Sequence, residues 1–290
     1  MNEAAFIAAL RALATDPAAR GLEDDAAVLD FGGETLVLTQ DTLVQGVHVR
    51  EDEDPADIAW KLVAVNLSDL AAKGAAPLGV LISHMLGHGD ERFLDGLAEV
   101  LREFDVPLLG GDTTGSGGGR RSWSCTALGR ATCRPVPDRR GARPGDAIWV
   151  TGTLGLAMLG LDEHERNSGS APDLAYRRPR PLLGEGAALA PLVSAMMDVS
   201  DGLLLDCMRM ARASAVSFHL DSGSFPVADP ARAQACVRWG DDYQLLFTAP
   251  PGTQLPVAAS QIGLVDTGGF EPLWIDGRAP DGDRLGYQHG

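Results

Sequence analysis

The sequence has little of what marks an exported, membrane-spanning or nucleic-acid-binding protein. No unbroken apolar run approaches the roughly 18 residues of a membrane-spanning helix, and no basic stretch followed by an apolar one opens the chain. Basic residues are scarce: 24 lysines and arginines face 40 aspartates and glutamates, for a formal charge of −16. A basic footprint for nucleic acid is therefore missing. We expect a soluble, unexported protein that binds neither nucleic acid nor membrane.

Cysteine and histidine motifs are absent as well. The four cysteines, Cys125, Cys133, Cys207 and Cys236, form no C-x-x-C pair, and the chain contains no H-E-x-x-H motif or Cys/His cluster. These absences argue against a disulfide framework, a structural zinc site and zinc catalysis. Reduced thiols in the cytoplasm are the simpler expectation.

Two common nucleotide-binding motifs are also missing. The glycine-rich stretch from Gly110 to Gly119 does not end in Gly-Lys-Ser/Thr, which disfavours a P-loop NTPase. It does not match G-x-G-x-x-G with an acidic residue about twenty positions later, so a dinucleotide site is poorly supported. Its backbone N–H groups still offer a cradle for phosphate oxygens, with a flexible surface loop as the alternative.

What the chain does contain is an ordinary globular composition and enough length for two domains. Hydrophobic residues make up 45% of its 290 residues, which is sufficient for a substantial core. The proline- and charge-rich stretch from Pro135 to Asp146 marks a junction. We therefore predict an N-terminal domain over residues 1–137 and a C-terminal domain over residues 138–290.

Hydrophobic spacing and cap residues predict a mixed α/β protein. Asp54 and Pro55 are a typical N-cap and first helical residue, and Gly74 is a typical end. Helices are predicted over the first twenty residues, from Asp54 to Gly74, from Glu91 to Phe104 and after Asp201. Strands are predicted over Thr35–Thr39, Leu78–Met85 and Ala147–Thr151.

The most informative feature is a set of aspartates that lie beside turns. Phosphoryl transfer needs charge neutralisation and positioning more than covalent chemistry from the protein, and magnesium favours carboxylate oxygens. Taken singly, each aspartate has a structural alternative: Asp69 is spaced to pair with Lys73, and Asp201 to cap a helix. The set comprises Asp24, Asp25, Asp41, Asp69, Asp112, Asp198, Asp201, Asp241 and Asp242.

Eight motifs, taken in order, resolve this ambiguity. They are DDAAV (24–28), DTLVQGVH (41–48), AVNLSDLAA (64–72), GGDTT (110–114), GARPGD (141–146), VTGTLG (150–155), DVSDG (198–202) and GDDY (240–243). Together they resemble the thiamine-monophosphate kinase family, whose superfamily includes aminoimidazole ribonucleotide synthetase and selenophosphate synthetase. Each motif is weak alone, but eight in the right order cover most of the chain.

The resemblance implies a fold and a reaction. The fold is α/β (α+β) with two domains, like that of aminoimidazole ribonucleotide synthetase: an N-terminal sheet at a homodimer interface and a C-terminal α/β domain that completes the active site. The reaction is direct transfer of the γ-phosphoryl group of ATP to thiamine monophosphate, with several magnesium ions as cofactor. Because the acceptor phosphate is already largely ionised at neutral pH, we nominate no protein nucleophile or base.

The resemblance also implies site residues, position by position. Metal ligands fall on Asp25, Thr39, Gln40, Asp41, Asp69, Asp112, Asp198 and Asp201. ATP contacts fall on Gly111, Asp112, Arg139 and Ser200. Contacts with thiamine monophosphate fall on His48, Asp241 and Tyr287.

The sequence departs from the family pattern mainly away from the metal carboxylates. Glu23, Gln40 and Gly115 stand where the family usually has a glycine, a hydroxyl residue and an arginine. Over residues 239–244, WGDDYQ replaces GGEDYE, which shortens an acidic substrate contact and adds an indole. Two alternatives stay open: another ATP-dependent reaction of the superfamily, and a nucleotide-binding homologue without turnover.

Overall fold

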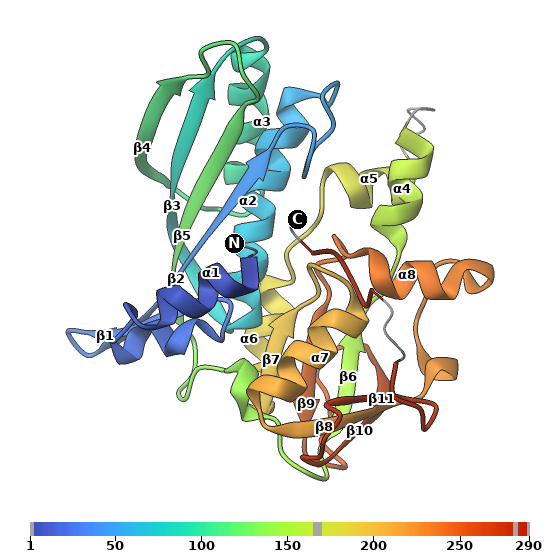
Figure 1. Ribbon diagram of the computed structural model, residues 1–290. Coiled ribbons are helices and arrows are strands. Elements are labelled where there is room, and N and C mark those ends of the chain that lie inside the picture. Colours follow the sequence, from blue (N-terminus) through green and yellow to red (C-terminus); the bar gives the residue numbers. More distant parts are fainter. Residues whose placement is uncertain (1–2, 165–169, 281–283, 289–290) are drawn as a thin grey trace.

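The chain folds around two β-sheets, each with its own hydrophobic core (Figure 1). The computed structural model describes residues 3–164, 170–280 and 284–288. The first core ends in sequence at Val136 and the second begins at Ala142. The predicted mixed α/β class is confirmed, while the boundary between residues 137 and 138 stays a prediction. None of the helices in these described ranges is both long and apolar enough to cross a membrane.

The first sheet has five strands in the order β1-β2-β5-β3-β4 and is covered on one face by helices α2 and α3 (Figure 1). Neighbouring strands are antiparallel, except that β3 and β4 are parallel. The elements are β1 (Ala27–Phe31), β2 (Glu34–Val44), α2 (Pro55–Ala72), β3 (Ala75–Leu86), α3 (Asp90–Glu103), β4 (Leu108–Gly115) and β5 (Ser122–Ala131).

Helix α2 begins and ends as predicted. The Asp54 carboxylate accepts a hydrogen bond from the N–H of Ala56, and Gly74 follows the helix with φ 56°. An amphipathic helix buries one side, but residues 56–72 of α2 are all buried. The first sheet packs on one side of the helix, and elements of the second domain contact another. Polar side chains of α2 such as Lys61 and Asp69 are therefore enclosed and need polar partners.

The predicted N-terminal helix is shorter than expected. Helix α1 spans Glu3–Arg11, and a separate 3₁₀ segment spans Pro17–Leu22. The side chain of Asp16 accepts a hydrogen bond from the N–H of Ala18 and begins this second segment. The predicted helix therefore ends at Arg11, and Pro17, which has no N–H to donate, begins the separate 3₁₀ segment.

The glycine-rich stretch forms an edge strand over its first half instead of a loop, while phosphate binding by its N–H groups stays a prediction. Strand β4 runs parallel to β3, and all of its residues are exposed. A Cβ atom at Gly111 would lie 1.8 Å from the carbonyl oxygen of Ile82. Only glycine therefore allows the two strands to approach this closely.

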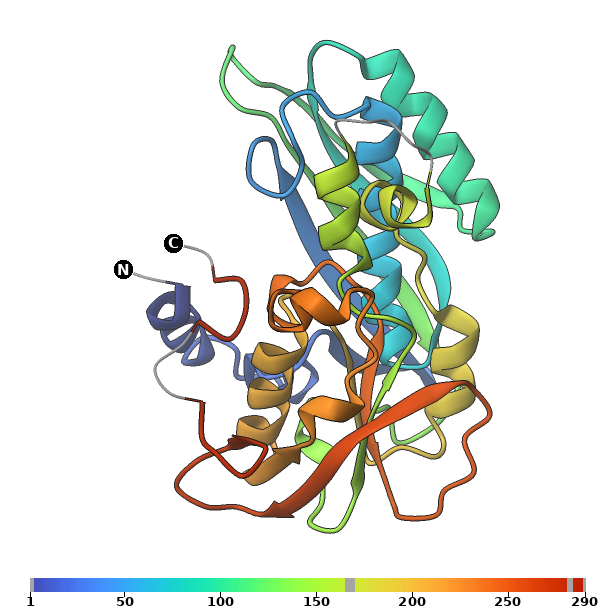
Figure 2. The ribbon, with the colours of Figure 1, turned by 90° about the vertical axis from the view of Figure 1, so that its right-hand side faces the viewer.

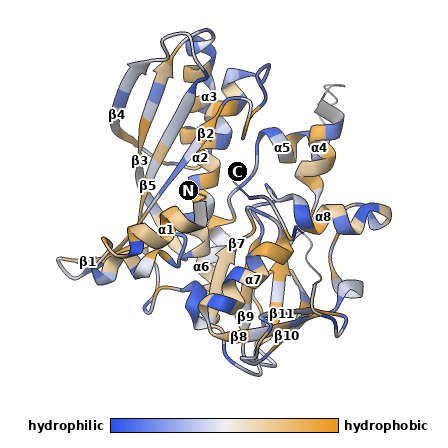
Figure 3. Cartoon of the chain, viewed as in Figure 1, coloured by the Kyte–Doolittle hydropathy of each residue, from blue (hydrophilic) through white to orange (hydrophobic). Residues whose placement is uncertain are grey.

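The second sheet has six strands in the order β11-β8-β10-β6-β9-β7. A helix, α7, follows Asp201 as predicted. It packs against one face of the sheet, and α6 and the end of α2 pack against the other. Hydrophobic (orange) stretches mark these buried elements in Figure 3. The elements are β6 (Ala147–Thr151), α4 (Leu156–His164), α5 (Ala171–Arg177), α6 (Leu183–Leu189), β7 (Ala195–Asp198), α7 (Leu203–Ala213), β8 (Val216–Leu220), α8 (Ala233–Trp239), β9 (Leu245–Ala249), β10 (Ala259–Thr267) and β11 (Leu273–Ile275).

The two domains meet along α2. A third hydrophobic cluster joins Ala71 and Ala72 at the end of this helix to Leu189, Met196 and Phe247 of the second domain. Figure 2 shows α2 (light blue) running from the first sheet toward the second domain. Side chains of α2 can therefore reach residues of both domains.

Candidate functional site

A cavity of about 680 Å³ is lined by residues of both domains. Most predicted site residues contribute to its wall, although they come from distant parts of the chain. The structure brings together Asp25, Thr39, Gln40, Asp41, His48, Asp69, Asp198, Ser200, Asp201, Asp241 and Tyr287. Gly111, Asp112 and Arg139 do not line the cavity.

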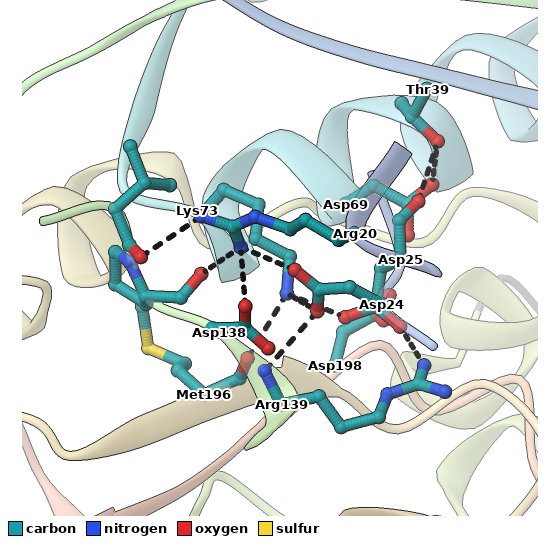
Figure 4. Close-up of polar contacts among 12 residues, drawn as sticks. Arg20, Asp24, Asp25, Thr39, Asp69, Lys73, Asp138, Arg139, Met196 and Asp198 are labelled. Carbon is teal, nitrogen blue, oxygen red and sulfur yellow. Dashed lines mark hydrogen bonds and ion pairs between the residues drawn. The ribbon is translucent and has the colours of Figure 1, made fainter. Parts of the chain in front are cut away.

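Hydrogen bonds from hydroxyl groups hold two of the carboxylates in place. The Thr39 hydroxyl on β2 donates to Asp69 on α2 over 2.5 Å (Figure 4). The Ser68 hydroxyl donates to Asp198 at the end of β7 over 2.6 Å. Ser68 and Asp69, which are consecutive on α2, thus take part in two bonds that hold one carboxylate of each domain at the same cavity.

These carboxylates are crowded and lack cationic partners. Burial and the neighbouring aspartates raise the pKa of Asp41 and of Asp69, and they raise the pKa of Asp198 to about 7. Within the described residues, no lysine or arginine pairs with any of the three. The crowding therefore opposes ionisation of these carboxyl groups, and a cation from outside would relieve it, which fits a divalent metal.

The donor set also indicates how such a metal would be held. Across the described residues, no group of three His, Cys, Asp or Glu side chains is arranged to hold a metal ion by itself. Magnesium commonly takes one or two carboxylates and completes its shell with water and phosphate oxygens. The residues present fit magnesium that is shared with a phosphorylated ligand.

Asp25 differs from Asp41, Asp69 and Asp198 because it has cationic partners in the protein (Figure 4). The Lys73 ammonium lies 2.8 Å from Asp25 and 2.5 Å from Asp24, and the Arg139 guanidinium also pairs with Asp25. Burial would raise the pKa of Asp25, but Arg139 and Lys73 outweigh it and lower the pKa to about 2. The alternative pairing of Lys73 with Asp69 is wrong, since Lys73 is committed to the other two aspartates.

Arg139 lies in this ion-pair network and not at the cavity wall. Its backbone N–H donates to Asp24 over 3.2 Å, and Arg20 and Asp138 extend the network (Figure 4). The side chain is 17% exposed. Its predicted contact with ATP phosphates therefore stays a prediction.

Asp201 is held at the cavity by a residue that sequence patterns did not indicate. Asp206, in the first turn of α7, accepts hydrogen bonds from the N–H groups of Ser200 and Asp201, each over 3.1 Å. Arg209 pairs with Asp201 over 2.5 Å. The alternative role of Asp201 as helix N-cap is wrong, because Gly202 occupies that position. The only sequence feature that could have indicated Asp206 was its position about one turn into the helix predicted after Asp201.

The predicted substrate residues lie among aromatic and apolar side chains. His48 accepts a hydrogen bond at Nδ1 from the N–H of Val44, and the N–H of Tyr287 donates to the carbonyl of Asp201. Sequence patterns did not indicate Tyr176 or Tyr243 as cavity residues, and they indicated Trp239 only as a departure from the family. We call the following set the aromatic lining: Tyr176, Trp239, Tyr243 and Tyr287.

Gln40 lies on the cavity-bearing strand but points its side chain elsewhere. Side chains alternate along a strand, so Gln40 faces away from the side that carries Thr39 and Asp41. Its amide oxygen accepts a hydrogen bond from Thr126 on β5 over 2.8 Å. A metal contact from Gln40 would therefore come from the main chain, which the change from a hydroxyl residue leaves intact.

Asp112 lies on the opposite face of the first sheet from the cavity carboxylates. The strand register aligns Thr42, Ser124, Ser83 and Asp112 in one row across β2, β5, β3 and β4. This row is on the face away from α2, and two strands separate β4 from β2. Within one chain, the structure does not bring Gly111 and Asp112 to the cavity.

Comparison with known proteins agrees with this two-domain arrangement. Residues 23–131 match the family model of the AIR synthase related protein, N-terminal domain. Residues 143–261 match the model of the C-terminal domain of the same proteins. Both halves that contribute to the cavity wall therefore belong to one known architecture.

Individual relatives identify the family within this architecture. The thiamine-monophosphate kinase of Escherichia coli strain K12 is 36% identical over 266 residues, which covers 84% of this chain and 81% of that protein. The same enzyme from Caulobacter vibrioides is 35% identical, over 95% of this chain and 86% of that protein. The solved structure of AaThiL complexed with AMPPCP and TMP matches 99% of this chain and 97% of its own, with a TM-score of 0.88 and 26% identity. The chain belongs to the thiamine-monophosphate kinase family.

Proposed function

We propose that this protein transfers the γ-phosphoryl group of ATP directly to the phosphate of thiamine monophosphate, forming thiamine diphosphate and ADP. The observation that carries the proposal is the cavity, where carboxylates of both domains that have no cationic partner among the described residues lie beside the aromatic lining. The relatives named thiamine-monophosphate kinase support it, as does the AaThiL complex with AMPPCP and TMP. The two ligands of that complex correspond to an ATP analogue and to the acceptor.

Magnesium fits the acidic part of this cavity. Asp41, Asp69 and Asp198 would hold it, with Thr39 and Asp201 beside them. Bound magnesium supplies charge neutralisation between the two anionic substrates and aligns the attacking and leaving oxygens. The number of ions that the crowded carboxylates take up is open to direct titration.

The protein's own residues supply positioning. Lys73 and Arg139 fix the Asp25 carboxylate, Asp206 and Arg209 fix Asp201, and the aromatic lining offers flat surfaces for the rings of thiamine. Holding the acceptor phosphate near the γ-phosphoryl group converts a bimolecular reaction into an effectively unimolecular one. The acceptor oxygen is already ionised, so no protein base is required.

The test is product analysis with purified protein, ATP, magnesium and thiamine monophosphate. We expect thiamine diphosphate and ADP in equal amounts. Free inorganic phosphate in place of thiamine diphosphate would point to an ATP-driven activation like those elsewhere in the superfamily. Binding of magnesium and ATP without any single-turnover transfer would show a homologue that has lost catalysis. Either result would overturn the proposed function.

The proposal includes a homodimer formed through the first sheet. The face away from α2 carries Leu38 and Leu128 directly opposite each other, and Leu81, which is 39% exposed. No helix among the described residues covers these side chains, and Asp112 lies on the same face. A second copy packed there would bury the apolar side chains. It would also allow Gly111 and Asp112 of one protomer to complete the cavity of the other.

A cytoplasmic location is proposed from the cysteines. All four are free thiols, and three of them are buried. Burial raises the pKa of Cys125 and of Cys207, which keeps these thiols protonated and poorly reactive. Free structural cysteines are typical of a reducing compartment.

A further inference from the structure

Lys61 is a buried cation next to the cavity that sequence patterns did not indicate. Its side chain on α2 is 4% exposed, and its ammonium lies 2.6 Å from the Asp241 carboxylate. The same ammonium lies 4.7 Å from the ring centroid of Tyr176. Asp241 and Tyr176 line the cavity, whereas Lys61 does not. One hidden cation therefore contacts two groups of the cavity wall.

Asp241 is held on both carboxylate oxygens and at its backbone. Lys61 contacts Oδ2, and the Tyr243 hydroxyl donates to Oδ1 over 3.0 Å. The Asp241 N–H donates to the carbonyl of Ser200, and the residue has φ 57° in the left-handed region. Its side chain nevertheless stays 30% exposed. A carboxylate accepts about four hydrogen bonds, so lone pairs remain for a ligand.

We propose that Lys61 is a positioning residue for the acceptor substrate. It fixes the Asp241 carboxylate and the Tyr176 ring as one recognition element for a cationic heteroaromatic ring, the class to which the thiazolium of thiamine monophosphate belongs. An aromatic face and a carboxylate together favour a flat cation over a neutral ring. The inference rests on the proposed function and adds to it a residue behind the cavity wall.

The contact between Lys61 and Asp241 also joins the two domains. A test must therefore distinguish an effect on domain packing from an effect on substrate positioning. Lys61 belongs to α2, and Asp241 follows α8 in the second domain, 180 positions later. Trp60, the preceding residue of α2, provides a matched control. Its indole N–H donates to the carbonyl of Pro179 over 3.0 Å, so it also bonds to the second domain, but it does not line the cavity.

The experiment compares steady-state kinetics of Lys61→Met, Lys61→Arg and Trp60→Phe. Lys61→Met should raise KM for thiamine monophosphate about tenfold or more, since it removes a charged hydrogen bond to Asp241, while KM for ATP changes less than about twofold. Lys61→Arg restores the cation and should recover most of this loss. Trp60→Phe should leave both KM values near those of the wild type.

Three results would overturn the inference: equal increases in both KM values for Lys61→Met, no rescue by Lys61→Arg, or the same KM change in Trp60→Phe. If Lys61→Met does not fold, Tyr243→Phe removes the other bond to Asp241 and must show the same selective increase. If the wild type forms thiamine diphosphate and these variants keep its KM for thiamine monophosphate, only the role of Lys61 is wrong. Absence of thiamine diphosphate from the wild type would remove the proposed function, and calorimetric binding of thiamine monophosphate would then decide the role of Lys61.

Discussion

The cavity aspartates differ mainly in the cations that lie beside them. Asp25 pairs with Lys73 and Arg139, and its pKa falls to about 2. Burial and the Asp25 charge raise the pKa of Asp198 to about 7. The cavity aspartates therefore divide into carboxylates with a cationic partner in the protein, namely Asp25, Asp201 and Asp241, and carboxylates with none among the described residues. The second kind, Asp41, Asp69 and Asp198, are the ones on which activity should depend most directly.

Replacing such a carboxylate should separate activity from stability. Asp41→Asn should lower kcat by about 100-fold or more, because the variant loses a carboxylate proposed to hold the metal that neutralises the substrate charges. The melting temperature without magnesium should rise by roughly a few degrees, since one of several crowded like charges is removed. Kinetics and thermal melts would check this. Asp266→Asn, at a carboxylate that is 65% exposed, should change neither quantity. Near-normal turnover in Asp41→Asn would contradict the role of this carboxylate.

Stability should depend on pH and magnesium together. The folded-state pKa of Asp198, about 7, lies above the ordinary value of 3.8, so the folded protein binds this proton more tightly than the unfolded chain. Its contribution to metal-free stability is therefore present at low pH and is lost as the pH rises toward 7. Because protons compete with magnesium, the increase in melting temperature on adding magnesium should be larger at pH 8 than at pH 6. Equal increases at both pH values would contradict a metal site built on these carboxylates.

At the scale of elements, α2 and β4 contribute to the site in different ways. Helix α2 lies between the domains and carries Asp69 at the cavity and Lys61 beside it. Strand β4 is the last strand of the first sheet and carries Gly111 and Asp112 on an exposed edge. The helix acts within its own chain, whereas the strand has a proposed role only across a dimer.

Strand β4 should tolerate a side chain at one glycine and not at another. Gly111→Ala should destabilise the fold by about 1–3 kcal/mol, because the new Cβ would lie 1.8 Å from the Ile82 carbonyl oxygen. Gly115→Ala in the same strand meets nothing within 4 Å and should be nearly neutral. Urea unfolding of both variants would check this. Equal stability of the two would show that β4 is not packed against β3 as described.

At the scale of the whole molecule, the position of Asp112 is the main argument for a dimer with shared sites. It lies on the uncovered face of the first sheet, separated from β2 by two strands and opposite to the cavity carboxylates. If the metal role implied by the family resemblance applies, a second protomer must bring this residue to the cavity. Asp112 would then act in a site to which the other protomer contributes Asp41.

Subunit mixing would test that arrangement. Asp41→Asn and Asp112→Asn should each lower activity by orders of magnitude as pure proteins. After random reassociation of equal amounts, half of the dimers contain one variant of each kind, and one of their two sites is intact. The mixture should therefore recover about a quarter of wild-type activity. Absence of recovery in a mixture shown by mass spectrometry to contain the mixed dimer would contradict the shared site.

Local patterns determined much of the secondary structure. The Asp54 cap, Pro55 and Gly74 delimit α2, and strand β6 has its predicted bounds, because caps, turns and alternation act between residues close in sequence. The eight ordered motifs also indicated the family, which the comparisons confirm. Two segments differ from their prediction: helix α1 ends at Arg11, and close approach to β3 made the glycine-rich stretch a strand.

Only the tertiary structure decided which partners the charged groups take. Lys73 is one turn from Asp69 on the same helix, yet it pairs with Asp24, 49 positions away, and Lys61 pairs with Asp241 across 180 positions. Burial of α2 on all sides removes solvent from these ammonium groups, so each binds whichever carboxylate the opposing chain segment presents. The sequence by itself determined the family, the aspartates and the helix that bears Asp69. The packing of two domains decided which carboxylates are neutralised and which remain for a metal.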